Sequence, residues 1–232
     1  MLGLFILYYP GMTKYYVVVP AHNESKHIRK CIENIQKYHT HIIVVDDGST
    51  DKTGEIIDKI KKITVIHLPT NMGKGKAMKI GAEAAWGMGA DGVIFMDGDN
   101  QHDPKHISDF VKHLKKGEQA VIGVRMLKTN IPLYRKVGNL IMSYVMKKFF
   151  TLSIPDMMCG YRAFSKQGYK KIVWESNGYE VETEVLTKIG HQGLPYKTVV
   201  VDTIYHDKYK GFSMLDGIRI MLKFPGWKIR NI

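Results

Sequence analysis

Hydrophobic and polar positions alternate in blocks that predict a regular succession of strands and helices in the first half of the chain. Short runs of β-branched, aromatic and other apolar residues are typical of buried strands, and apolar residues that return every three or four positions are typical of helices. The predicted strands cover residues 15–19, 42–45, 64–68, 93–96 and 120–124. Helical patterns lie between them at residues 28–35, 56–60, about 77–88 and 104–115. Because strands and helices alternate through short loops, we expect a mostly parallel sheet with right-handed crossovers.

The pattern in the second half of the chain is weaker and more basic. Apolar residues at helical spacing are mixed with lysine and arginine from Leu133 to Phe149, and a similar mixture recurs from Met214 to Trp227. Such a helix is usually solvated and packed on its own core, but it also suits a membrane surface, and the sequence leaves both readings open. The other elements expected here are a short strand after a turn at 156–161, a helix that opens near Glu180, and a strand at 195–201.

Composition favours a single globular domain with an anionic partner. The chain has 232 residues, 44% of them hydrophobic, which suits one α/β domain at 13–213 followed by a basic amphipathic segment at 214–232. A net charge of +12 calls for a nucleic acid, an anionic lipid surface or a phosphorylated substrate. No RNA-binding aromatic motif occurs, so nucleic acid is the least favoured of the three. Two distant cysteines, Cys31 and Cys159, suit reduced thiols in a cytoplasmic protein.

Two acids follow the predicted strand at 93–96 and suggest a metal site. Asp97 and Asp99 are two positions apart, so both carboxylates can project to one side of the strand end. Hard oxygen ligands at this spacing suit Mg²⁺ or Mn²⁺, with water and substrate phosphates in the remaining positions. A plain acidic loop is the alternative. An EF-hand is excluded because its glycine and glutamate positions hold His102 and Ser108.

Other polar groups end the neighbouring predicted strands. Asp46 and Asp47 follow the strand at 42–45, and the loop Gly73-Lys74-Gly75 follows the strand at 64–68. The carboxyl ends of parallel strands meet at one edge of a sheet, where α/β proteins bind ligands. The loop could offer backbone N–H groups and an ammonium to a phosphate, although by itself it also reads as a helix-capping loop. Together these groups predict a pocket for a nucleoside diphosphate held partly through metal.

The order of these motifs resembles the family 2 glycosyltransferases of the GT-A fold, and within them the polyprenyl-phosphate sugar synthases of the dolichol-phosphate mannosyltransferase type. The resemblance runs from Val17 to Ser213, nearly the whole chain. The matching segments are Val17–Glu24, Val44–Asp51, Asn71–Gly75, Asp97–His102 and Cys159–Arg162. The chain departs from the family's late Arg-x-x-Gly-x-Ser-Lys motif, since Lys208 and Met214 replace its first and last residues. His22 stands where many relatives have tyrosine.

This resemblance implies a role for each matched residue. Metal ligands would be Asp97, Asp99 and Gln101, holding Mg²⁺ or Mn²⁺. Catalytic residues would be Asp99, Arg125 and Arg135. Nucleotide-sugar contacts would come from Pro20, Asn23, Glu24, Asp46, Asp47, Lys74, Asp97, Gly98, Asp99 and Lys208. The acceptor lipid phosphate would be bound by Arg125, Arg135, Arg162 and Ser213.

The implied reaction is inverting transfer of a hexose to a polyprenyl or dolichyl phosphate. Mannose is favoured over glucose, with GDP-mannose or UDP-glucose as donor, by a peripheral protein at the cytoplasmic face of the membrane with or without a membrane-anchoring partner. No nucleic acid is expected to bind. A family 2 enzyme with a polysaccharide, protein or small soluble acceptor is the alternative, and it would need a general base, for which Glu182 and Glu184 are candidates. A basic nucleic-acid-binding module is a more distant alternative.

Overall fold

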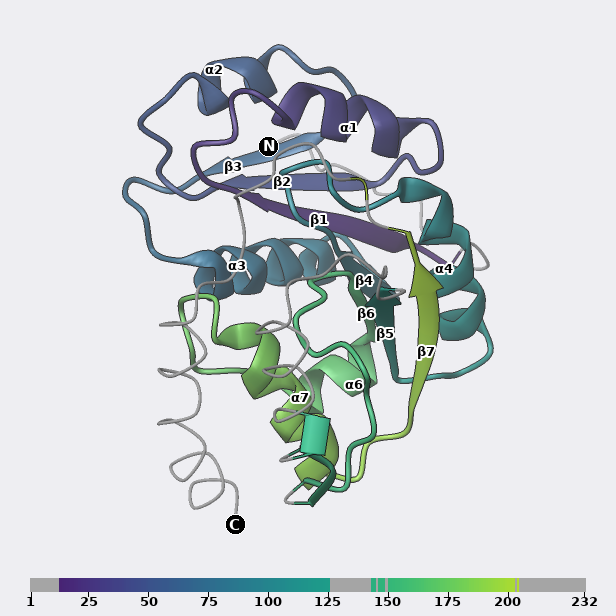
Figure 1. Ribbon diagram of the computed structural model, residues 1–232. Coiled ribbons are helices and arrows are strands. Elements are labelled where there is room, and N and C mark those ends of the chain that lie inside the picture. The colour runs from purple at the N-terminus through teal and green to yellow at the C-terminus, as the bar shows by residue number, and fades with distance from the viewer. Residues whose placement is uncertain (1–12, 126–142, 145, 149, 203, 205–232) are drawn as a thin grey trace, which may run out of the picture.

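A seven-stranded sheet forms the centre of the protein, in the strand order β3-β2-β1-β4-β6-β5-β7 (Figure 1). The computed structural model describes residues 13–125, 143–144, 146–148, 150–202 and 204. The strands are β1 Tyr15–Ala21, β2 Ile42–Asp46, β3 Thr64–His67, β4 Gly92–Phe95, β5 Ala120–Arg125, β6 Arg162–Ser165 and β7 Tyr196–Val201. The predicted strands are therefore confirmed as elements of one sheet.

The sheet is parallel except around β6. Strand β1 pairs in parallel with both β2 and β4, and β5 pairs in parallel with β7. Strand β6 lies between β4 and β5 and is antiparallel to both. The α/β class and the mostly parallel sheet predicted from the sequence are confirmed, but the sequence did not reveal that β6 separates β4 from β5. A strand inserted from later in the chain changes neighbours without changing any local pattern.

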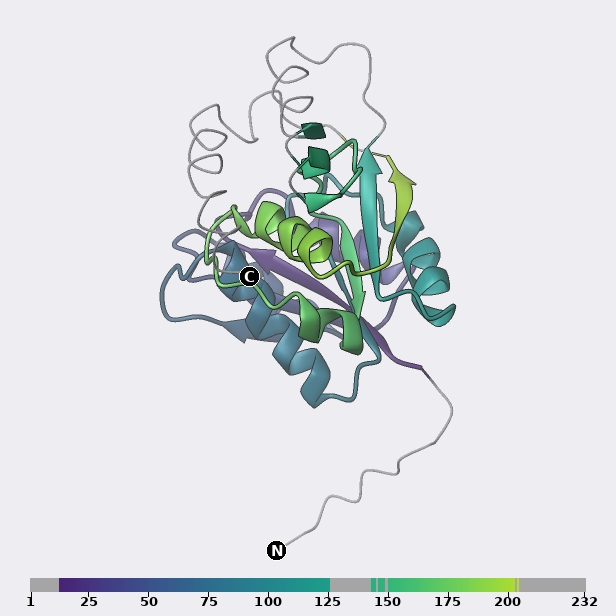
Figure 2. The ribbon, with the colours of Figure 1, turned by 90° about the horizontal axis from the view of Figure 1, so that it is seen from below.

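Helices cover both faces of this sheet (Figures 1 and 2). Residues alternate along β1, so that Val17 and Val19 face one core while Tyr16 and Val18 face the other. Helices α1, α2 and α4 pack over the first core, and α3, α6 and α7 over the second. Their bounds are α1 Ile28–Gln36, α2 Thr53–Asp58, α3 Lys74–Gly87, α4 Ile107–Lys115, α6 Lys166–Lys171 and α7 Val181–His191, and a 3-10 turn, η1, covers Pro104–His106.

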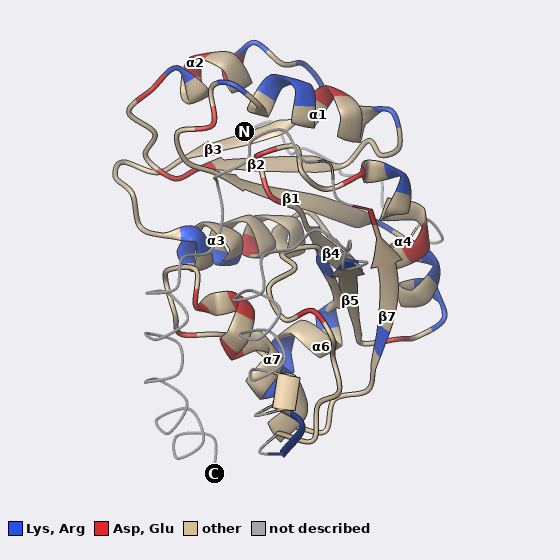
Figure 3. Ribbon diagram, in the orientation of Figure 1, with Lys and Arg blue, Asp and Glu red and all other residues tan. Residues whose placement is uncertain are grey.

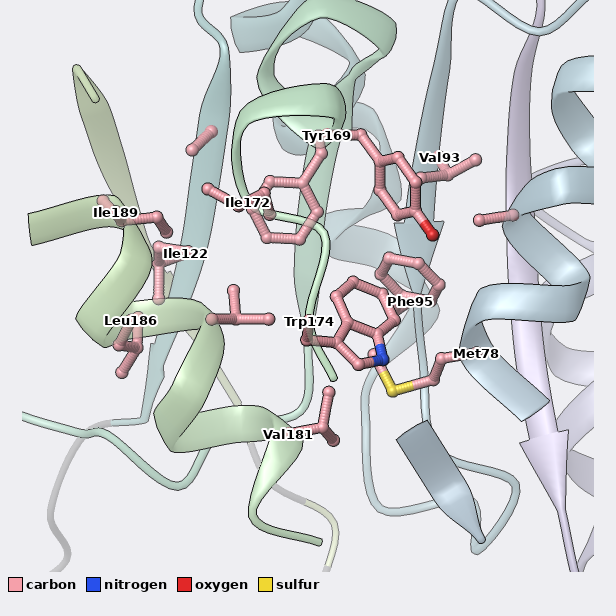
Figure 4. Packing of buried hydrophobic residues seen from close by; sticks show 14 of the residues in the cluster. Met78, Val93, Phe95, Ile122, Tyr169, Ile172, Trp174, Val181, Leu186 and Ile189 are labelled. Atoms are coloured by element: carbon pink, nitrogen blue, oxygen red, sulfur yellow. The ribbon is translucent and has the colours of Figure 1, made fainter. Parts of the chain in front are cut away.

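Trp174 lies at the centre of the second core and ties it to the first turn of α3. Its ring is fully buried and meets Phe95 edge-on, with 5.8 Å between ring centroids, among Met78 and Val181 (Figure 4). The indole Nε1 donates a hydrogen bond of 2.8 Å to the Gly75 carbonyl. A large rigid anchor of this kind fixes the position of the loop at the amino end of α3.

Both basic amphipathic patterns lie largely or wholly outside the described residues. This applies to most of 133–149 and to all of 214–232, so the amphipathic helices remain a prediction, as does the single domain at 13–213. No helix in the described part of the chain is long and apolar enough to cross a membrane.

His67, on the edge strand β3, gives the fold a pH dependence that can be measured. Its Nδ1 lies 3.0 Å from Asp46 Oδ2 and its Nε2 lies 2.9 Å from Asp58 Oδ1. Hydrogen bonds to Asp58 and then to Asp46 raise the pKa of His67. The charged ring therefore adds stability that is fully present below the unfolded-state pKa of about 6.5 and is lost as pH rises through the higher folded-state pKa.

We expect the variant His67→Gln to be less stable than the wild type at pH 5.5 and to differ less from it at pH 9. The imidazole is 45% exposed, so solvent screening limits the charge contribution to less than about 1 kcal/mol. Urea unfolding at both pH values measures the difference. The variant Asp58→Asn, which removes the first partner, should show a weaker pH dependence than the wild type. A stability gap that widens toward pH 9 would contradict this assignment.

Candidate functional site

Charged residues from three separate segments meet at the edge of the sheet where β1, β2 and β4 have their carboxyl ends. In Figure 3 the basic start of α3 faces the acidic start of α7 across this edge. The turn after β4 carries Asp97 and Asp99, the first turn of α3 carries Lys74, and the start of α7 carries Glu182. The parallel strands β1, β2 and β4 bring their carboxyl ends to one edge, as the sequence predicted.

Lys74 joins two of these segments through its ammonium. Its Nζ lies 2.6 Å from Asp97 Oδ1 and 2.6 Å from Glu182 Oε1. The side chains are mostly buried, with 13% of Lys74, 26% of Asp97 and 8% of Glu182 exposed. Burial by itself would lower the pKa of Lys74, but the two carboxylates outweigh it and raise that pKa. Burial likewise opposes ionisation of Asp97, yet Lys74 holds the pKa of Asp97 at about 2. Lys74 and Asp97 are therefore both charged at neutral pH.

Asp99 lies beside this ion cluster in a tight turn. Its Oδ1 accepts a 2.9 Å hydrogen bond from the Gln101 N–H, and Asn100 between them has a left-handed backbone with φ of 61°. Burial, and then repulsion from Asp97, raise the pKa of Asp99. Asp99 is thus less readily ionised than an exposed carboxyl group.

Gly160 and an aromatic stack fix the position of Asp97. A Cβ atom added at Gly160 would lie 2.7 Å from Asp97 Oδ2. The loop before β6 can therefore approach this carboxylate so closely only because residue 160 is a glycine. His102 Nδ1 accepts a 3.3 Å hydrogen bond from the Asp97 N–H, and its ring stacks on Tyr161 at 5.1 Å. Burial lowers the pKa of His102, so we assign a neutral ring with its proton on Nε2. That nitrogen lies 3.8 Å from Asp97 Oδ2.

Hydrogen bonds within the protein hold the glycine loop. Asp47 is 3% exposed, and its carboxylate accepts hydrogen bonds from the N–H groups of Met72 (2.7 Å) and Gly73 (2.9 Å). The Gly75 N–H donates to the Asn177 carbonyl at 2.6 Å. The N–H groups of Gly73 and Gly75 thus already have acceptors within the protein, and a phosphate contact by the backbone of this loop remains a prediction. The ammonium of Lys74 is the part of the loop that faces the acids.

Close packing explains why the loop has two glycines. Gly73 has φ of 93°, and a Cβ there would lie 2.4 Å from the Asn177 carbonyl oxygen. A Cβ at Gly75 would lie 2.2 Å from the Ser176 carbonyl oxygen. The segment before α7 thus lies directly against the loop before α3, and it brings Glu182 to Lys74.

Hydrogen bonds join the loop after β1 to the loop after β2. Asn23 Oδ1 accepts hydrogen bonds from the N–H groups of Thr50 (2.8 Å) and Asp51 (3.2 Å). Asp46 is bonded to the Ser49 N–H and to His67, and the Glu24 N–H donates to Thr53 Oγ1 at 2.8 Å. In this arrangement the side chains of Asn23 and Asp46 shape the loops, and a direct contact with a nucleotide remains a prediction for both.

Pro20 and Gly98 also lie at the site. Pro20 is buried at the end of β1, and its carbonyl oxygen would be 3.3 Å from a Cβ added at Gly98. Gly98 is therefore packed against β1, which keeps the turn between Asp97 and Asp99 close to the sheet. Gln101 is half-buried, and its carbonyl accepts the Ile204 N–H at 2.9 Å. Its role as a metal ligand remains a prediction.

Two arginines expected to meet an acceptor phosphate differ in their surroundings. Arg125, at the end of β5, forms a bidentate pair with Asp156, at 2.7 Å from Nε and 2.9 Å from Nη2, and 30% of its side chain is exposed. Arg125 lowers the pKa of Asp156 against the opposing effect of burial, so the pair is charged. Arg125 can still present its exposed edge to an anion.

Arg162 requires a correction. It is 2% exposed, and its guanidinium donates to the carbonyls of Cys159 (2.9 Å), Met157 (2.8 Å) and Glu182. All three of its nitrogens are thus engaged with main-chain oxygens inside the protein. The structure gives Arg162 a structural role and does not support the acceptor contact expected from the sequence. The remaining expected site residues, Arg135, Lys208 and Ser213, lie outside the described residues.

Sequence reasoning missed two partners in this site. The sequence places Asp156 only in a polar turn, although the residue neutralises Arg125. It offers Glu182 as a general base, but not as the partner of Lys74, from which it is 108 positions distant. Glu184, the other candidate base, accepts hydrogen bonds of 2.8 Å from the N–H groups of Glu175 and Ser176 and so anchors the loop before α7. Glu180, Glu182 and Glu184 stand close together at the start of α7. This cluster was the feature of the sequence that could have indicated a basic partner.

The carboxylates fit a divalent ion of the Mg²⁺ or Mn²⁺ class. Asp97 and Asp99 supply hard oxygen donors, and the raised pKa of Asp99 reflects burial and negative charge that a cation would stabilise. No cluster of three or more His, Cys, Asp and Glu side chains suited to a metal occurs among the residues that the structure describes. Two carboxylates would leave the other coordination positions to water and phosphate oxygens, which is the usual arrangement for Mg²⁺ at nucleotide sites.

Comparison with known proteins identifies the class of protein and then its family. The fold is that of GT-A glycosyltransferases: glucosyl-3-phosphoglycerate synthase from Mycobacterium tuberculosis, solved with Mn²⁺ and UDP, aligns with a TM-score of 0.71 and 21% identity, covering 93% of this chain and 78% of that one. The family model for glycosyl transferase family 2 matches residues 16–173. This chain therefore belongs to glycosyl transferase family 2.

Two relatives with assigned functions are similar over nearly their whole length. UDP-N-acetylglucosamine–dolichyl-phosphate N-acetylglucosaminyltransferase from Methanococcus voltae is 30% identical, over 90% of this chain and 91% of the relative. Polyprenol monophosphomannose synthase from Mycolicibacterium smegmatis is 27% identical, over 93% of this chain and 87% of the relative. The resemblance to polyprenyl-phosphate sugar transferases noted in the sequence is confirmed by these relatives.

Proposed function

We propose that this protein transfers a sugar from a nucleoside diphosphate donor to a polyprenyl or dolichyl phosphate, with inversion at the anomeric carbon and with Mg²⁺ or Mn²⁺ as cofactor. The observation that carries the proposal is the Asp97–Asp99 pair at the carboxyl end of β4, beside Lys74, in a family 2 glycosyltransferase. The two relatives named above act on dolichyl phosphate and make a polyprenol monophosphosugar, by their names.

The chain's own residues suit this reaction. When bound, the divalent ion supplies positive charge to the donor diphosphate. Lys74 and the exposed edge of Arg125 add further positive charge where the leaving group develops its own negative charge. A lipid phosphate is already an anion at neutral pH, so it attacks without a strong general base. In-line attack on the anomeric carbon then inverts its configuration.

The environment of Glu182 also favours the lipid phosphate over a hydroxyl acceptor. A hydroxyl group would need a base at the site. Glu182 is the acid at the site edge that sequence reasoning assigned to this task, but its carboxylate is paired with Lys74 at 2.6 Å. Glu184 is committed to two backbone N–H groups. Membership of glycosyl transferase family 2 favours an enzyme over the nucleic-acid-binding alternative.

We favour mannose, as the motif pattern implies, while the Methanococcus voltae relative uses UDP-N-acetylglucosamine, by its name. The site is expected to work on the cytoplasmic face of a membrane, where nucleotide sugars are available, with the protein bound peripherally.

The test is an incubation of the purified protein with polyprenyl phosphate, Mg²⁺ or Mn²⁺, and labelled GDP-mannose, UDP-glucose or UDP-N-acetylglucosamine. We expect labelled lipid from one donor, loss of the product with a chelator, and a product of inverted anomeric configuration by NMR. Matched reactions with a polyprenol that lacks the phosphate should give no product. Transfer to soluble hydroxyl acceptors without any labelled lipid phosphate would refute the proposed acceptor.

A further inference from the structure

The ammonium of Lys74 contacts the same carboxylate that a metal ion would use. Its Nζ is 2.6 Å from Asp97 Oδ1 and 2.6 Å from Glu182 Oε1, and only 13% of the Lys74 side chain is exposed. A cation in contact with the Asp97 oxygen competes with a second cation for it, since two positive charges at such a distance in a partly buried site repel one another strongly. One of the two carboxylates expected to bind the metal, Asp97, is therefore already in contact with a cation.

We propose that Lys74 is a built-in counter-cation of the free enzyme, which a divalent ion displaces from Asp97 and which Glu182 then retains at the site for the donor diphosphate. This inference rests on the proposed metal-dependent donor site. It adds an exchange of cations that links metal binding to donor binding.

Glu182 and Tyr179 make such an exchange physically reasonable. Glu182 lies at the start of α7, on a different segment from Asp97, and contacts the same ammonium at 2.6 Å. The ring of Tyr179 lies 5.7 Å from Nζ and is 68% exposed. Lys74 can thus leave Asp97 by side-chain rotation while it keeps one carboxylate and one aromatic face as partners. The backbone of its loop need not move, because Asp47 and Asn177 hold it.

The exchange also predicts the direction of coupling between ligands. When a divalent ion binds Asp97, the Lys74 ammonium loses its contact with that carboxylate. The ammonium can then donate to an anion instead. Donor diphosphate bound at Lys74 in turn removes the competitor from Asp97. By linkage, each ligand raises the affinity for the other by the same factor.

Titration of Mn²⁺ into nucleotide-free protein, followed by the EPR signal of the free ion, tests this exchange. We expect Lys74→Gln to bind Mn²⁺ about fivefold more tightly than the wild type, because the competing ammonium is gone. Lys74→Arg, which keeps the charge, should bind it about as the wild type does. The matched control is Lys76→Gln, on the same turn of α3, whose side chain is half-buried. Adding a nucleoside diphosphate should raise the Mn²⁺ affinity of Lys74→Gln by a smaller factor than it raises that of the wild type.

A second measurement needs no variant and covers the case in which Lys74→Gln does not fold. Acetylation of the wild-type protein, followed by mass spectrometry, should become faster at Lys74 when saturating Mg²⁺ is added and stay constant at Lys76. If Lys74→Gln binds Mn²⁺ no more tightly than Lys76→Gln, or if Mg²⁺ leaves acetylation of Lys74 unchanged, the exchange is refuted while the donor site stands. If neither the wild type nor any variant binds Mn²⁺, even with nucleotide, both the exchange and the proposed metal-dependent function are refuted.

Discussion

Replacing Asp97 with Asn is expected to lower the rate of sugar transfer by at least about a hundredfold. The change keeps the shape of the side chain and removes its charge. It takes away one of the two carboxylates proposed to hold the metal, and it leaves the Lys74 ammonium with Glu182 as its sole close carboxylate among those described. Initial rates at saturating donor and lipid phosphate measure the effect.

The matched control for this variant is Asp109→Asn, on α4, where the carboxylate is 52% exposed. Its transfer rate should stay close to that of the wild type, because an exposed carboxylate outside the site contributes little. Thermal unfolding of both variants shows whether the loss is chemical. A folded Asp97→Asn variant that retains more than about a third of the wild-type rate would contradict the metal and donor site.

Replacing Arg162 with Met is expected to lower the free energy of unfolding by about 3–5 kcal/mol. Methionine fills much of the space but donates nothing, so the three main-chain carbonyls of Met157, Cys159 and Glu182 lose a shared donor inside the protein. Urea unfolding measures the change. The rate of sugar transfer should also fall, because Arg162 holds the main chain of Glu182, the residue whose carboxylate pairs with Lys74.

The control for Arg162→Met is Arg29→Met, on the exposed side of α1, where 48% of the side chain is accessible. Its stability should change by no more than about 0.5 kcal/mol. The comparison also separates the two roles considered for Arg162. If Arg162→Met is as stable as the wild type but has a raised KM for lipid phosphate, the acceptor role expected from the sequence would be restored and the structural role refuted.

Much of the candidate site followed from local sequence patterns. Asp47, Lys74 and Asp97 each follow a separate predicted strand, and parallel pairing brings strand ends to one edge, so the sequence alone predicts their proximity. It does not predict which groups these side chains contact. Asp47 was expected at a nucleotide, yet it caps the N–H groups of the glycine loop, because in the folded chain those groups need an acceptor.

The sequence by itself determined the order of strands and helices, the α/β class and the acids at the end of β4, because these depend on periodicity and turn chemistry within a few residues. Only the tertiary structure decided that β6 enters the sheet between β4 and β5, that Arg162 is internal, and that Glu182 meets Lys74. These depend on which distant segments share a core and on burial, which sets the partners that a charged side chain must have. The acid pair is therefore a local feature of the sequence, whereas its contact with the Lys74 ammonium is a product of the fold.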